Sequence, residues 1–105
     1  MMTFGHIIAE ARKKLGLSQK DLALRIKKED GSQISPQYLN DIERDRRNPP
    51  SEFLIAQFAT ELNLSKDYLI LAAGSLPNDM TKKVTGADPA KVEQAFQAFR
   101  KQIKH

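Results

Sequence analysis

The chain has 105 residues, of which 40% are apolar and 29% charged, and this is enough for one modest core. It contains no cysteine, which excludes a disulfide framework, a thiolate zinc site and a cysteine nucleophile. The two histidines, His6 and His105, have no neighbours at metal-ligand spacing, so we expect no metal. The longest apolar run, Tyr68–Ala73, is too short to cross a membrane, and the N-terminus lacks a signal-peptide pattern.

The net charge of +4 is unevenly divided along the chain. Residues 1–50 carry ten basic and seven acidic side chains, residues 51–79 carry one and four, and residues 80–105 carry six and two. A basic first half followed by an acidic, apolar middle indicates one surface for a polyanion and another for packing. The total by itself is ordinary for a small protein.

Apolar residues at helical spacing predict two helices in the first third of the chain. They recur at intervals of four, three and four from Phe4 to Leu15, with Gly16 as the stop. Ser18, with an acidic residue three positions later, predicts a capping-box start for a second helix. Residues 27–33 are all polar, which predicts a frayed helix end and a loop.

Three further helices follow, and each begins after a serine that can serve as its N-cap. These serines are Ser35, Ser51 and Ser65. Asn48-Pro49-Pro50 forbids helix and separates the first two, and Gly74 ends the last. The helix after Ser51 is apolar on most sides, so we expect it to be central. No alternating β-branched run is long enough for a strand, and the predicted fold class is all-α.

The last part of the chain is predicted to hold a linker or arm at residues 77–87, after a domain at residues 1–76. Residues 88–105 predict an amphipathic helix that begins at an Asp-Pro pair. Its apolar stripe comprises Val92, Phe96, Phe99 and Ile103. The stripe can cover the protein's own core, pack on a second copy of the chain in a twofold-symmetric dimer, or bind another protein. We favour the second copy, because so small a protein has little else for this helix to pack on.

An ordered set of short motifs resembles the phage-repressor (Cro/XRE) helix-turn-helix family. The set is Gly16-Leu17-Ser18-Gln19, Leu22-Ala23, Ile34-Ser35, Leu39, Ile42-Glu43-Arg44 and Arg47-Asn48-Pro49. The resemblance covers residues 3–74. It implies a five-helix lambda-repressor-like bundle that binds double-stranded DNA through a recognition helix near residues 35–43.

A recognition helix needs one buried face to fix it and one exposed face to meet base edges. We expect Leu39 and Ile42 to face inward. The candidates for reading bases are Pro36, Gln37, Tyr38, Asn40 and Asp41. Gln and Asn can form paired bonds with adenine, and Asp can accept from cytosine N4. The alternative is that these residues are solvated polar side chains with no partner.

The phosphate-contact candidates flank this helix on both sides. They are Ser18, Gln19, Arg44, Arg46, Arg47 and Asn48. Free N–H groups at a helix start attract phosphate, and the resemblance implies that Gln19 bonds the DNA backbone. Without the motif, the arginines would be read as a salt-bridged surface. The resemblance also implies that Arg12 and Glu43 form a structural ion pair.

Two features depart from the family pattern. Residues 27–33 make the turn between the second and third helices unusually long, which puts the standard angle between those helices in doubt. Lys27 and Lys28 could add phosphate contacts there, although a solvated loop is favoured. Asp45 stands where the family usually has glycine, a small change because Asp tolerates left-handed backbone.

These features predict a cytoplasmic, homodimeric, sequence-specific transcriptional regulator, and we favour a repressor that occupies an operator. The alternative is an antitoxin-type module whose C-terminal arm binds a toxin and which autoregulates its operon. We expect no cofactor and no membrane contact. The chain shows no paired carboxylates, Ser/His arrangement or phosphate-cradling glycine loop, so we expect no enzyme.

Overall fold

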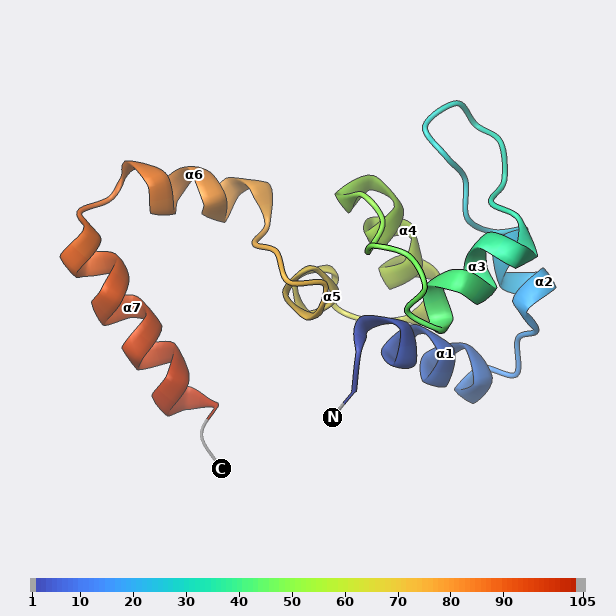
Figure 1. The fold of residues 1–105 in the computed structure, drawn as a ribbon, viewed down its shortest axis with the longest axis horizontal. Coiled ribbons are helices and arrows are strands. Elements are labelled where there is room, and N and C mark those ends of the chain that lie inside the picture. The colour runs from blue at the N-terminus through green and yellow to red at the C-terminus, as the bar shows by residue number, and fades with distance from the viewer. Residues whose placement is uncertain (1, 104–105) are drawn as a thin grey trace. The chain divides into compact units, whose positions relative to one another are not determined.

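A computed structural model describes residues 2–103, and within them the fold is all-α, as predicted (Figure 1). The helices are α1 (Phe4–Lys14), α2 (Gln19–Ala23), α3 (Pro36–Glu43), α4 (Glu52–Leu62), α5 (Lys66–Ala72), α6 (Asn78–Gly86) and α7 (Pro89–Gln102). The chain divides into two compact units, residues 1–75 and residues 76–105. Met1, Lys104 and His105, at the ends of the predicted domain and terminal helix, lie outside the described residues.

Helices α2 to α5 begin where side-chain caps were predicted. Ser18 forms a complete capping box: its hydroxyl accepts from the Asp21 N–H at 3.0 Å, and its own N–H donates to the Asp21 carboxylate at 3.1 Å. Ser35 accepts from the Tyr38 N–H at 3.0 Å and starts α3. Asp45, after α3, has a φ of 57°, so its backbone is left-handed.

The core of the first unit is built from α1 to α5. Helix α1 packs on α3 and α4, α2 packs on α3, and α4 packs on α5. Phe58 of α4 is fully buried, in agreement with a central role for that helix. Leu15, the last residue of the predicted apolar stripe, is half exposed and follows the end of α1 at Lys14. The recognition helix therefore rests on a packed bundle through one face.

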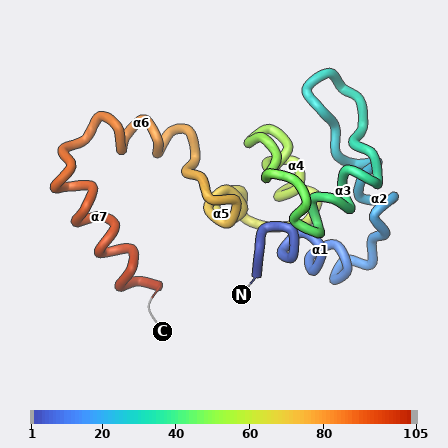
Figure 2. Tube along the Cα trace, viewed as in Figure 1, coloured from blue at the N-terminus to red at the C-terminus, as the bar shows by residue number. Residues whose placement is uncertain are grey.

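The long turn between α2 and α3 is a narrow hairpin, closed by a bridge between its first and last residues, Lys27 and Gln33. Below the bridge, the Ile34 N–H donates to the Ile26 carbonyl at 3.0 Å, and both side chains are buried. The Gln57 amide of α4 bonds both the N–H and the carbonyl of Lys27. The two ends of the hairpin therefore lie side by side where it joins the helical bundle, as Figures 1 and 2 show.

The second unit begins with a helix that the sequence analysis does not predict. Most of residues 77–87, the segment interpreted as a linker or arm, form α6. Pro77 and the polar residues after it mark the start of a helix, and Gly86 is its last residue. Neither α6 nor α7 contains a buried side chain within the described residues. The α7 stripe stays accessible, with Phe99 47% exposed.

Candidate nucleic-acid interface

A buried ion pair fixes the recognition helix α3 on α1. Arg12, which is only 8% exposed, donates from Nε to Glu43 Oε2 at 2.7 Å and from Nη2 to Glu43 Oε1 at 2.9 Å. Its third nitrogen, Nη1, donates to the Leu17 carbonyl at 2.8 Å. The bond to Glu43 raises the pKa of the Arg12 guanidinium above its ordinary value. The pair carries the structural role that the resemblance implied for it.

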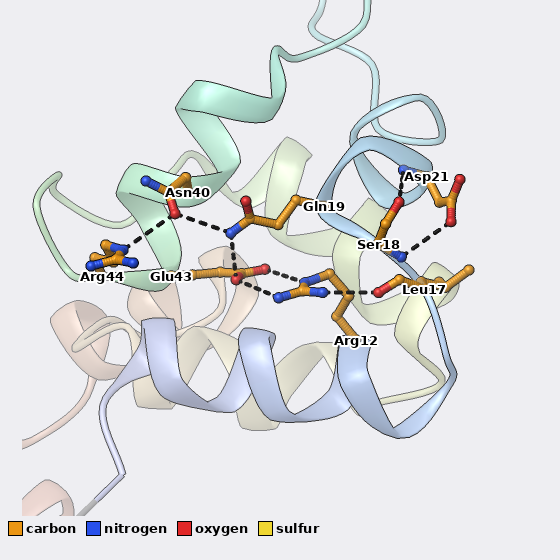
Figure 3. Close-up of polar contacts among 8 residues, drawn as sticks. All are labelled: Arg12, Leu17, Ser18, Gln19, Asp21, Asn40, Glu43 and Arg44. Atoms are coloured by element: carbon orange, nitrogen blue, oxygen red, sulfur yellow. Dashed lines mark hydrogen bonds and ion pairs between the residues drawn. The ribbon is translucent and has the colours of Figure 1, made fainter.

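A second layer of bonds joins the start of α2 to α3 (Figure 3). The Gln19 amide nitrogen donates to Glu43 Oε1 at 2.9 Å and to Asn40 Oδ1 at 3.2 Å. Arg44 Nε donates to the same Asn40 oxygen at 3.3 Å. Three residues that the sequence assigned to base or phosphate contact are therefore linked to the buried ion pair.

The outer side of α3 carries a separate polar group. The Gln37 amide donates to Asp41 Oδ1 at 3.0 Å, and Arg47 Nε lies 3.6 Å from Asp41 Oδ2. The Arg47 guanidinium stands over the Tyr38 ring, 5.0 Å from its centre. Leu39 of the same helix is buried. The helix thus has the two faces that base reading requires.

The combination of α2, turn and α3 matches a known family. A family model described as Helix-turn-helix matches residues 8–69, more than half of the chain. The chain belongs to the helix-turn-helix family. The resemblance to its Cro/XRE branch is confirmed, and the protein is a DNA-binding transcription regulator.

A solved structure is similar to this helix-turn-helix protein, and the search of curated proteins found no match. The similar chain comes from a SinR protein/SinI protein complex, with a TM-score of 0.54 and 24% identity. The match covers 95% of this chain and 99% of that one. This likeness shows a shared fold.

Asp45 of the helix-turn-helix protein has a tertiary role that its backbone geometry does not reveal. Its carboxylate accepts from the Gly5 N–H at 3.0 Å and from the Thr3 hydroxyl, so it ties the end of α3 to the start of α1. This close approach of α1 to the end of α3 requires glycine at position 5, because a Cβ on Gly5 would lie 2.3 Å from the Ile42 carbonyl oxygen. Only the fold brings these positions together.

The phosphate-contact candidates are accessible with one exception. Ser18, Arg44, Arg46, Arg47 and Asn48 are exposed, and Gln19 is half-buried. Of the base-reading candidates, Pro36 and Gln37 are exposed, whereas Tyr38, Asn40 and Asp41 are half-buried. Lys27 and Lys28 are exposed on the hairpin, which borders an open groove against α3 lined partly by Tyr38 and Arg47. The anchor of this hairpin, Gln57, gave no signal in the sequence.

No described helix is long and apolar enough to cross a membrane. Among residues 2–103, His, Asp and Glu side chains form no cluster that could hold a metal ion.

Proposed function

We propose that this protein is a sequence-specific repressor that occupies an operator in the cytoplasm as a homodimer, by binding and without catalysis or cofactor. The observation that carries the proposal is the anchoring of α3. Its inner face is fixed by Leu39 and by the buried Arg12–Glu43 pair, while its outer face remains free to meet DNA. A rigid helix with a polar outer face is suited to the major groove.

Gln37 and Asp41 are the side chains best placed to read bases. Asp41 accepts one N–H of the Gln37 amide, which leaves the second N–H and the carbonyl oxygen of Gln37 for a base edge. Those two groups complement the N7 and N6 of adenine. The bond to Asp41 therefore orients Gln37 before DNA arrives.

The arginines after α3 supply the phosphate contacts in this proposal. Arg44, Arg46 and Arg47 are exposed and lie within four positions of one another at the end of the helix. Cations that neutralise phosphates release counterions, so affinity falls as salt rises. We expect a log–log slope of about −4 or steeper for a dimer.

The stripe on α7 is the proposed dimer surface. Phe96 is 39% exposed and Ile103 is 55% exposed, so one copy of the chain leaves apolar area in contact with water. A second copy that covers the stripe would hold two recognition helices for two half-sites, about one turn of DNA apart. Each half-site would then add to the affinity of the other.

Selection of DNA from a random pool tests this function directly. The wild-type protein should enrich a twofold-symmetric site. Gln37→Ala should relax one base position per half-site at a cost of roughly 1–3 kcal/mol, whereas Arg46→Ala should weaken specific and random DNA alike. Phe96→Ser with Phe99→Ser should give a monomer by sedimentation. Failure to enrich any sequence would exclude the proposal.

An antitoxin-type role is the second candidate, and the accessible second unit favours it. Helices α6 and α7 bury no side chain of their own within the described residues, and the similar solved chain comes from a complex of two different proteins. A growth-inhibiting protein encoded beside this one would be the partner. The Phe96 and Phe99 serine variants should then lose neutralisation of that protein.

A further inference from the structure

Both N–H groups of the Gln19 side-chain amide donate hydrogen bonds within the protein. Its nitrogen donates to Glu43 Oε1 at 2.9 Å and to Asn40 Oδ1 at 3.2 Å. A carboxylate only accepts, so the nitrogen and not the oxygen of this amide must face Glu43. What remains free is the Gln19 carbonyl oxygen. A phosphate oxygen also only accepts, so this side chain has no donor left for the DNA backbone.

The orientation of Gln19 is held from within the core. Both oxygens of Glu43 are bonded by Arg12, at 2.7 and 2.9 Å, and the Glu43 side chain is only 6% exposed. The carboxylate therefore cannot turn away to release the Gln19 amide. An ion pair in the interior sets the direction of a hydrogen-bonding group at the surface.

The same bonds set the direction of Asn40. Its oxygen accepts from Gln19 and from Arg44 Nε, which are both donors, so its nitrogen must lie on the other side of the amide. Figure 3 shows that nitrogen pointing away from both bonds. Within residues 2–103 it donates to no side chain or backbone group. Asn40 therefore presents two free N–H groups and no free acceptor.

We propose that Asn40 takes the place of Gln19 as the side-chain donor to an operator phosphate, an assignment that rests on the proposed function. Adenine is read by an amide that offers a donor and an acceptor together, and the Asn40 acceptor is already used. Phosphate offers acceptors only, which matches a pair of free N–H groups. Arg44, bonded to Asn40 through Nε alone, keeps its remaining N–H groups and its charge for the same stretch of backbone.

The location of Asn40 agrees with this role. Its oxygen accepts from Arg44 just after α3, an exposed cation that the proposed function places on the phosphate backbone. Gln37 and Asp41 instead bond each other and Arg47. The recognition helix thus carries two sets of polar side chains. Asn40, which is bonded to α2, is placed for the DNA backbone, and Gln37 with Asp41 is placed for the bases.

The test uses two variants of the full-length protein. Asn40→Asp keeps an oxygen for Gln19 and Arg44 but replaces the outward N–H groups with a second oxygen. Asn40→Leu removes the donors without adding charge. Both should lose about tenfold or more in affinity, by the same factor on the selected operator and on random duplex, with the selected bases unchanged. Asn63→Asp, an exposed substitution with the same charge change, should bind as the wild type does.

Operators with single neutral methylphosphonate linkages locate the contact. Neutral linkages at the phosphates that the arginines contact should weaken the wild type and Asn40→Leu alike. At one further phosphate per half-site, the linkage should weaken the wild type and cause no additional loss in Asn40→Leu. Thermal unfolding without DNA establishes that each variant is folded.

A changed base preference in Asn40→Leu, with unchanged binding to random duplex, would show that Asn40 reads a base and would overturn the inference. Wild-type affinity in both variants would overturn it as well. In either case the wild type still selects an operator, so the proposed function stands. A wild type that selects no sequence removes the function and this inference together.

Discussion

Residues 1–75 and residues 76–105 are both helical and both carry apolar stripes, yet only the first unit buries them. Phe58 of α4 is 0% exposed, whereas Phe99 of α7 remains half exposed. Every ion pair found within residues 2–103 also lies in the first unit. A stripe at helical spacing therefore predicts a helix but does not predict what covers it, because covering requires a second element at the right place.

The first unit also uses its polar residues differently. Arg12, Glu43 and Gln19 form a connected set in which each donor meets an acceptor. No buried side-chain nitrogen or oxygen among the described residues lacks a partner. Such a set holds α3 in one orientation, since any shift would leave a buried charge unpaired. The contrast between the units is open to direct test.

The largest difference is expected between two phenylalanine truncations. Phe58→Ala should lower the free energy of unfolding by about 3–5 kcal/mol, because it empties a packed core. Phe96→Ala should change it much less in the monomer, since that side chain already contacts water. Urea denaturation followed by circular dichroism, at a concentration where the chain is monomeric, measures both. Equal losses would mean that α7 packs on the chain's own core.

The next effect concerns arginines in buried and exposed ion pairs. Arg12→Met should cost about 3 kcal/mol or more, because it leaves the buried Glu43 carboxylate without its cation. Arg25→Met is the control: Arg25 lies 3.8 Å from Glu61 on the surface, and its loss should cost less than about 1 kcal/mol. A small loss for Arg12→Met, by the same denaturation, would show that the pair does not hold α3.

Two glycine substitutions should differ in their effect on stability. Gly5→Ala places a Cβ 2.3 Å from the Ile42 carbonyl oxygen and 2.8 Å from that of Glu43, so α1 and α3 must separate, at roughly 2–3 kcal/mol. Gly86→Ala meets no atom within 4 Å and lies at the end of α6, so it should be neutral or slightly stabilising. Thermal melting of both variants measures this difference in stability. A stable Gly5→Ala protein would contradict the close contact of these helices.

The smallest effect is a dependence on pH at the start of α2. Bonds from the Ser18 N–H and hydroxyl lower the pKa of the Asp21 carboxyl. A lowered pKa means that the capping box stabilises the fold at neutral pH. This contribution is lost as the pH falls below about 4 and through the lowered pKa. Comparison of unfolding between neutral and acidic pH should show a shallower decline in Asp21→Asn than in the wild type.

The sequence alone determined the local elements of the first unit. Ser18, Ser35, Ser51 and Ser65 predicted the starts of four helices, because an N-cap bond joins residues only three positions apart. The same local reasoning missed α6, because it interprets Pro77 and the polar residues after it as a linker or arm, whereas they begin a helix. A signal for a boundary does not say on which side of it the helix lies.

The tertiary structure alone decided how the interface side chains are used. The sequence named Gln19 and Asn40 as contacts, but an amide can present its oxygen or its nitrogen, and only the position of Glu43 determines which. Asp45 likewise suited a left-handed turn, whereas its bond to Gly5 joins positions forty residues apart. Local bonds can be read from sequence spacing. The direction of a hydrogen bond between distant residues depends on the packing that brings them together.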